Sequence, residues 1–158
     1  MEIKGKQENM LAGVVGALVG AAIGGGSILL LGQLGYVSAL SGLILAVCTL
    51  KGYELLGGRL SGKGIAVCVV LMLVTPYFAD RLDWAISLKN ELARYDYYMT
   101  LGEVYSAIPG FLAEDLIDAT AYYMNLAMIY AFLLLGGFST VHRTLKARKA
   151  EEEAQDLI

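Results

Sequence analysis

One cluster of residues in this sequence has side chains whose types and spacing could do chemistry. Asp80, Arg81, Asp83 and Trp84 stand together where a long apolar stretch gives way to charged residues. The two carboxylates could draw cations to the outer mouth of a path through a membrane, or they could simply solvate the end of a helix. Both interpretations stay open here, and Asp80, Asp83 and Trp84 are predicted as a candidate outer vestibule.

The remaining reactive side chains do not form a recognisable site. Cys48 and Cys68 lie inside apolar runs without Cys-x-x-Cys or metal-ligand spacing, which predicts buried thiols. The single histidine, His142, adjoins Arg143, where positive charge suits a helix C-terminus and an anionic lipid surface. No nucleophile, phosphate-loop or metalloprotease motif occurs. We therefore expect no enzyme activity, no metal site and no cofactor.

The composition indicates that lipid, not water, surrounds most of the chain. Of the 158 residues, 57% are hydrophobic and only 17% are charged, whereas soluble domains carry about a quarter charged residues. So few polar side chains cannot cover the core of a protein of this length in water. The first apolar stretch runs far beyond a short signal sequence and lacks a convincing cleavage site, so no cleavable signal peptide is expected.

The apolar runs predict four membrane-spanning helices in a single all-α membrane domain, residues 1–158. No charged residue or histidine occurs from Met10 to Leu50, and one span needs about 20 residues, so this stretch holds two helices that break at Gly32–Tyr36. Pro76 is expected to kink the third helix rather than end it. The predicted spans are 10–31, 36–56, 65–84 and 119–141, with an outer loop at 85–118 and a tail at 142–158.

The predicted outer loop contains amphipathic helical segments. Thr100 and Glu103 have the spacing of a capping box for a short helix, which Pro109 and Gly110 are expected to interrupt. Asp118 is expected to cap the fourth span. Tyrosines at positions 95, 97 and 98 are expected to reach the headgroup layer or a partner protein.

The distribution of charge predicts the orientation of the chain. Lysine and arginine gather in the N-terminal segment, in the turn between the second and third spans, and after the fourth span, and such residues mark the cytoplasmic side. The segment between the third and fourth spans contains eight acidic residues and three basic ones. Both termini are therefore expected in the cytoplasm, with the acidic loop on the outer side of the plasma membrane.

Small residues form two stripes along the first span. In lipid, helices associate through close contact of small side chains. The stripes are expected to pack against the second or fourth span, to form a contact between copies in a homo-oligomer, or to do both. They consist of Gly16, Gly20 and Gly24 in one row, and Gly13, Ala17, Ala21 and Gly25 in the other.

Two segments carry a resemblance to a known set of proteins. "LGQLGYVSALSGLILAVCTLKGYELLGGRLSGKG" and "YFADRLDWAI" resemble sequences of small, uncharacterised four-span membrane proteins of Gram-positive gut bacteria. Those proteins share a glycine-rich first helix, an "LGY" turn, and "KGYELLGG" before a basic loop. The resemblance implies a membrane protein and brings no function with it.

Two classes of function follow from these features. The preferred one is a small oligomeric channel or transporter for small solutes or cations, with the acidic outer loop favouring cations. The alternative is a non-transporting assembly subunit that docks a partner protein through its outer loop. The lipid bilayer is the expected surrounding, and no nucleic-acid partner is expected.

Overall fold

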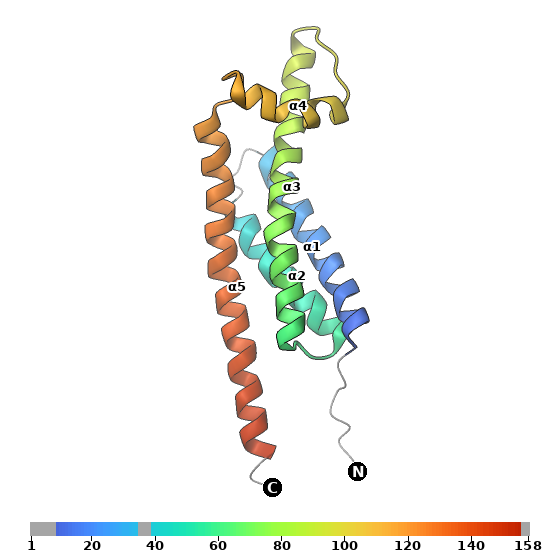
Figure 1. Cartoon of the computed structure of the whole chain (residues 1–158), viewed down its shortest axis with the longest axis vertical. Coiled ribbons are helices and arrows are strands. Elements are labelled where there is room, and N and C mark those ends of the chain that lie inside the picture. The colour runs from blue at the N-terminus through green and yellow to red at the C-terminus, as the bar shows by residue number, and fades with distance from the viewer. Residues whose placement is uncertain (1–8, 35–38, 156–158) are drawn as a thin grey trace.

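A computed structural model describes residues 9–34 and 39–155, and these residues form five helices without a strand (Figure 1). Four of the helices are long and apolar enough to cross a membrane, which confirms the all-α class and the predicted number of candidate spans. The short remaining helix, α4, lies in the predicted outer loop. The helices are α1 (Met10–Gln33), α2 (Ala39–Gly57), α3 (Gly62–Arg94), α4 (Leu101–Ala113) and α5 (Ala119–Gln155).

Helices α1, α3 and α5 are longer than the predicted spans. The third predicted span and the amphipathic segment after it form one helix, α3, which continues through Pro76. Helix α5 runs well past residue 141, so most of the charged tail is helical. The predicted start of the second span, residue 36, lies outside the described residues.

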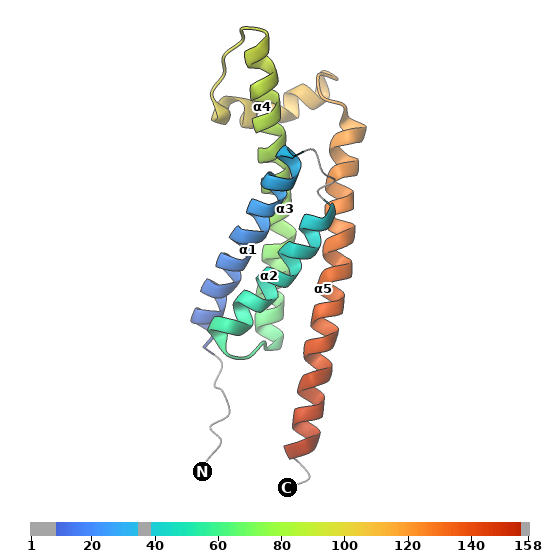
Figure 2. The ribbon, with the colours of Figure 1, turned by 180° about the vertical axis from the view of Figure 1, so that it is seen from behind.

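The five helices form an elongated bundle (Figures 1 and 2). Helix α1 packs mainly against α2 and also against α3, whereas α5 packs mainly against α2. Helix α4 lies across one end of the bundle beside α3, and α3 continues beyond it (Figure 1). The start of α1, the turn between α2 and α3, and the end of α5 all lie at the opposite end.

Glycines allow α1 and α2 to approach backbone to backbone. A Cβ atom added to Gly16 would collide with the carbonyl oxygen of Gly52, and one added to Gly20 with that of Cys48. The second row of small residues turns partly toward α3, where Gly25 faces Thr75. Both rows are therefore covered within one chain. All seven residues predicted for these rows are buried: Gly13, Gly16, Ala17, Gly20, Ala21, Gly24 and Gly25.

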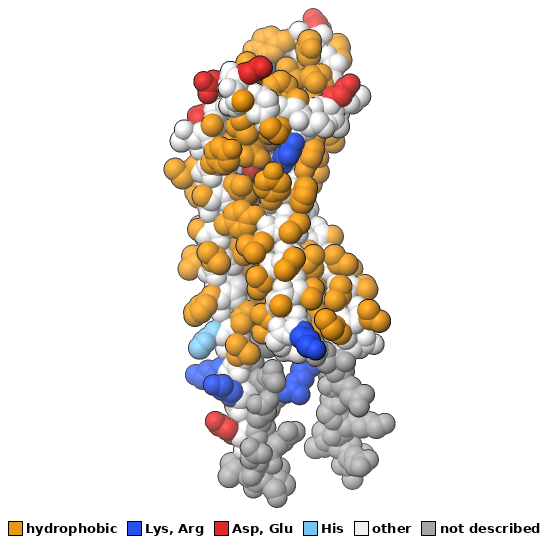
Figure 3. Space-filling view, viewed as in Figure 1, with side chains coloured by type: hydrophobic (Ala, Val, Ile, Leu, Met, Phe, Trp, Pro, Cys, Tyr) orange, Lys and Arg blue, Asp and Glu red, His pale blue; other side chains and the backbone are white. Residues whose placement is uncertain are grey.

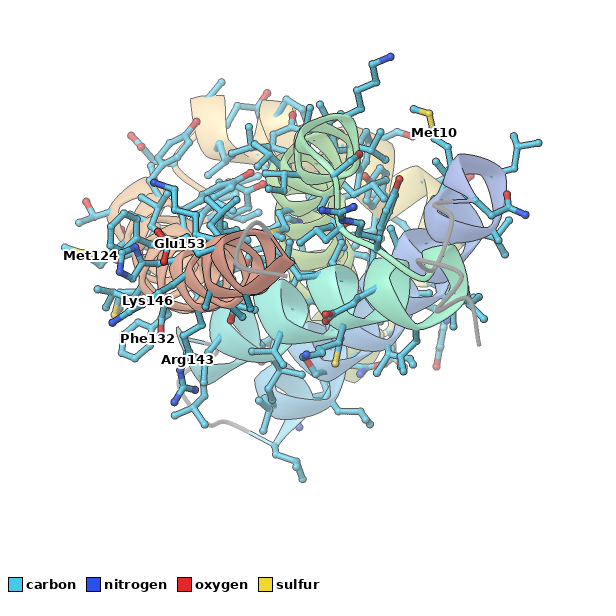
Figure 4. All side chains as sticks on the ribbon, turned by 90° about the horizontal axis from the view of Figure 1, so that it is seen from below. Met10, Met124, Phe132, Arg143, Lys146 and Glu153 are labelled. Atoms are coloured by element: carbon cyan, nitrogen blue, oxygen red, sulfur yellow. The ribbon has the colours of Figure 1, made fainter. Side chains whose placement is uncertain are left out.

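The outside of the bundle is largely apolar. Large hydrophobic side chains such as Leu11, Leu30 and Phe138 are exposed, and hydrophobic side chains cover the middle of the face in Figure 3. Viewed from below in Figure 4, Met124 and Phe132 of α5 point away from the other helices. These surfaces suit a lipid surrounding better than water.

Helix α4 corrects one prediction, because Pro109 does not interrupt it. Thr100 and Glu103 form the predicted capping box, but the helix continues through Pro109 to Ala113. A proline at this position cannot donate to the carbonyl of Tyr105, four residues earlier. Arg81 of α3 fills that role, donating from Nε and Nη2 to the Tyr105 oxygen at 3.1 and 2.8 Å. The helix tolerates the proline because another helix satisfies the carbonyl.

Candidate functional site: a buried carboxylate on α3

Asp80 is a fully buried carboxylate at the junction of α3 and α5. Its side chain is 0% exposed. Oδ1 accepts a hydrogen bond of 2.5 Å from Nδ2 of Asn125 on α5, and Oδ2 has no hydrogen-bond partner among the described residues. A buried carboxylate oxygen without a donor is costly. The Asp80 carboxylate is therefore only partly compensated by hydrogen bonds from the described residues.

Asp83 lies one helical turn from Asp80, toward the α4 end of the bundle. Its Oδ1 accepts a hydrogen bond of 2.8 Å from Nε2 of Gln33, at the end of α1. The same nitrogen lies 3.3 Å from the hydroxyl oxygen of Ser87, to which it also donates. Gly32 permits this approach, because a Cβ there would strike the Asp83 carboxylate. A row of polar side chains, formed by Asp83, Gln33 and Ser87, thus lies between Asp80 and the end of α1.

Trp84, the third residue of the predicted vestibule, does not join these polar groups. Its ring packs against Tyr122 of α5, with 5.6 Å between ring centroids, at the edge of an apolar cluster that includes Ala85 and Ile108. Of the three predicted residues, the structure brings together Asp80 and Asp83 and leaves Trp84 as a packing residue.

Toward the other end of the bundle, the core beside α1, α2 and α3 is apolar. Ile28, Leu45 and Met72 are buried in one hydrophobic cluster. The same region holds a second buried oxygen without a partner among the described residues, Oγ1 of Thr49. The core on this side of Asp80 is therefore mainly apolar, with few buried polar groups.

The cysteines and the histidine take no part in this site. Cys68 is buried, as predicted, and its thiol lies 3.8 Å from the Thr49 carbonyl oxygen, to which it donates. Cys48 is only half-buried, which corrects the prediction for that thiol, because it lies toward the outside of α2. His142 stacks on Phe138 with 6.0 Å between centroids.

The side chains around Asp80 offer a small set of oxygen ligands. Hard cations take oxygen ligands, and Asp80 supplies one carboxylate, whereas Asn125 directs its amide nitrogen toward that carboxylate. Among the described residues, no three histidine, cysteine, aspartate or glutamate side chains lie close enough together to hold a metal ion. Divalent and transition metals, which need larger sets of charged or nitrogen ligands, fit these donors poorly.

No role was predicted from the sequence for two residues of this region, Asn125 and Arg81. Asn125 is an amide inside an apolar helix, and that polarity was a signal available in the sequence. Arg81 stands beside Asp80 and Asp83 in the sequence, but nothing there predicts a role for it. Its acceptor, the Tyr105 carbonyl oxygen on α4, comes close only in the folded chain.

Comparisons of the chain with protein-family models, with curated proteins and with solved structures found no match. Function is therefore inferred from the residues and their geometry alone.

Proposed function

We propose that this chain is a multi-pass protein of the bacterial plasma membrane that binds a small monovalent cation at Asp80 and moves it across the membrane. The observation that carries the proposal is the fully buried Asp80 carboxylate, with one oxygen on Asn125 and the other without a partner among the described residues. Ionisable residues within membrane spans are rare, and they usually serve ion binding or transport.

The distribution of charge supports an orientation with both termini in the cytoplasm. In Figure 3, acidic side chains gather at the α4 end of the visible face, and most of the basic ones lie at the opposite end. Basic residues favour the cytoplasmic side. A cation would then approach Asp80 from outside, past the acidic segment between α3 and α5 and the Asp83 carboxylate.

The apolar core beside Asp80 favours a gated path over a permanently open pore. Ile28 and Leu45 are 0% exposed, and the buried residues beside α1 and α2 are mostly apolar, with Ser41 and Thr49 as the buried polar residues of α2. Hydrophobic constrictions of this kind close channels by excluding water. We therefore propose a carrier or a gated channel, whose transport step requires a change in helix packing.

The test is cation flux into liposomes that contain the purified full-length chain. Uptake of K⁺ and Na⁺ is compared with uptake of chloride for the parent protein and for Asp80→Asn, which keeps the shape of the side chain and removes its charge. Asp96→Asn is the matched control, because Asp96 is exposed in the α3–α4 loop with a positive φ of 59° that asparagine tolerates. We expect cation uptake by the parent and near-background uptake by Asp80→Asn, whereas Asp96→Asn, which removes only one of the acidic charges on the approach, should keep most of the parent's uptake.

Thermal stability separates this role from a structural one. Removing a buried charge that lacks full compensation should leave stability unchanged or raise it. A transport role therefore predicts lost flux in a stable Asp80→Asn protein. Chloride preference, or full cation flux in Asp80→Asn, would rule out the proposed site.

One observation favours the alternative function, a subunit that docks a partner protein. Tyr95, Tyr97 and Tyr98 are 77, 61 and 79% exposed. They follow the end of α3, which extends eleven residues beyond Asp83 to Arg94, or about 16 Å at the rise of an α-helix. Headgroups add only about 5–7 Å beyond each side of the hydrocarbon core. Aromatic side chains this far out suit a protein surface, and capture of a defined partner that is lost on changing all three tyrosines to serine would support this function.

A homo-oligomer, if it forms, must use a surface other than the glycine rows. Gly16, Gly20 and Gly25 already face α2 or α3 of the same chain. The oligomeric state in nanodiscs, measured by light scattering, would test this part of the proposal.

A further inference from the structure

A groove between α3 and α5, called here the α3/α5 groove, contains two cavities in line. The cavity nearer α4 has a volume of about 370 Å³, and the other has a volume of about 260 Å³. Residues four apart share one face of a helix, and one such row on α3 lines both cavities: Ile65, Val69, Leu73, Tyr77 and Arg81. Between the cavities, the hydroxyl of Tyr130 on α5 donates to the Leu73 carbonyl oxygen at 2.5 Å.

The two cavities differ in chemistry. The one near α4 is lined by Arg81 and three tyrosines, Tyr77, Tyr122 and Tyr123, together with apolar residues of α4 and α5. The other is lined by aliphatic and aromatic side chains together with Met72 and Gly137, and carries no charged side chain. A ligand that fills both would have a polar, anionic head and an apolar chain.

Arg81 has hydrogen-bonding capacity that the described residues do not use. Nε and Nη2 donate to the Tyr105 carbonyl oxygen, and the guanidinium lies 4.5 Å from the centroid of the Tyr105 ring. Neither ion pair found among the described residues includes Arg81. The edge of the guanidinium formed by Nη1 and Nη2 is thus available, and such an edge fits two oxygens of a phosphate.

We propose that the α3/α5 groove binds an anionic phospholipid, with its phosphate on Arg81 and one acyl chain along the apolar cavity. From Arg81 to Ile65, the farthest lining residue on α3, the helix rises by about 24 Å. Half of the ~30 Å hydrocarbon core belongs to one leaflet, so the acyl chain would fill the part of the apolar cavity nearer to Arg81. The proposal depends on the membrane location of the chain but not on cation transport, so either can fail without the other.

The head of the ligand is tested by native mass spectrometry of the detergent-solubilised full-length chain. Phosphatidylglycerol and phosphatidylcholine with identical acyl chains are added in turn. We expect phosphatidylglycerol to bind about tenfold more tightly, because charge-assisted bonds to a net anionic headgroup are stronger. Arg81→Gln should abolish this preference, and Arg94→Gln should keep it, because Arg94 is exposed at the end of the same helix and pairs with Glu91.

Arg81 also supports α4 through Tyr105, so the fold of Arg81→Gln must be checked by circular dichroism. Arg81→Lys, which keeps the charge without the bidentate edge, provides a second variant and should bind phosphatidylglycerol more weakly than the parent does. Equal binding of the two lipids by the parent protein would overturn the proposal whatever the variants do.

The acyl-chain site is tested by filling the apolar cavity. Leu134 lines it and is 65% exposed, whereas the adjacent Leu135 is 66% exposed and is not among the lining residues. Leu134→Trp should weaken phosphatidylglycerol binding severalfold, and Leu135→Trp should not. Glycerol phosphate, which has the head without the chain, should compete poorly. Equal effects of the two tryptophans, or full competition by glycerol phosphate, would overturn the phospholipid assignment.

Discussion

Replacing Gly20 by alanine should destabilise this protein, because no side chain fits between α1 and α2 at that position. A Cβ on Gly20 would lie 2.6 Å from the carbonyl carbon of Cys48 and 2.9 Å from Cα of Thr49, whereas ordinary contact begins at 3.4 Å. Both atoms belong to the backbone of α2, so no change of rotamer relieves the clash. Relief of the contact with the carbonyl carbon alone requires the helices to separate by about 0.8 Å, the difference between 2.6 and 3.4 Å, and the Cys48 carbonyl oxygen, which lies closer still, requires more.

The matched control is Gly26→Ala in the same helix. A Cβ on Gly26 meets nothing within 4 Å. Alanine raises helix propensity by up to ~1 kcal/mol at either position, so the difference between the two variants isolates the cost of overpacking, typically ~1–3 kcal/mol. Separation of the helices at Gly20 would also disturb the contact between Gly16 and Gly52. We therefore expect the stability difference between the two variants to lie in the upper part of that range.

The measurement is the free energy of unfolding in mixed detergent micelles, with helical content as the signal. Gly26→Ala should be as stable as the parent chain or more stable, and Gly20→Ala should be clearly less stable. Equal stability of the two variants would refute the close backbone contact between α1 and α2.

Three further predictions concern other parts of the chain. Tyr53 is 0% exposed and its ring lies against Gly13 and Gly64, so Tyr53→Ala should cost ~3–5 kcal/mol in the same unfolding assay, and Tyr53→Phe much less. Hydrogen bonds from the backbone and side chain of Thr100 hold the pKa of Glu103 below its usual 4.5. A lowered pKa stabilises the folded state above pH 4.5, and this contribution disappears as the pH falls through the lowered value; NMR shifts of the first turn of α4 should show that loss, and Glu103→Gln should remove it. Cysteines placed at Gly62 and Gly102, both exposed with open space around them, should be labelled from opposite sides of the membrane by an impermeant thiol reagent, and labelling of both from one side would contradict four spans.

The long helices of the fold were predictable from local features of the sequence. The uncharged stretch from Met10 to Leu50 is long enough for two spans, and Thr100 and Glu103 have the spacing of the capping box that forms. The effect of Pro109 was not predictable, because the donor that compensates for it, Arg81, lies on another helix. A proline disrupts a helix only if nothing else satisfies the carbonyl that it leaves.

The candidate site was predictable only in part. The sequence places Asp80 and Asp83 at the end of an apolar stretch, but it does not say whether Asp80 is exposed or buried. Burial follows from the packing of α5, whose Asn125 lies 45 residues away in the chain. That packing depends in turn on Gly42, where a Cβ would collide with the Ile129 carbonyl oxygen of α5.

Different kinds of contact hold the two sides of the bundle, and this difference indicates which helices can move. Helices α1 and α2 meet through backbone atoms at Gly16 and Gly20, a contact that cannot shift without a clash. Near α4, helix α3 meets its neighbours through side chains: an apolar cluster that includes Ala85 and Ile108, and polar pairs of which Asp80 with Asn125 is buried. Polar groups can exchange partners, and rotation of the Asn125 amide would replace its donated hydrogen bond by an oxygen directed at a bound cation. Helix α5 also meets α2 through backbone atoms, at Gly42 and the Ile129 carbonyl oxygen, so α3 is the helix that can move. Because α3 carries both Asp80 and Arg81, a cation at Asp80 and a lipid at Arg81 would act on one movable helix beside a fixed group formed by α1, α2 and α5.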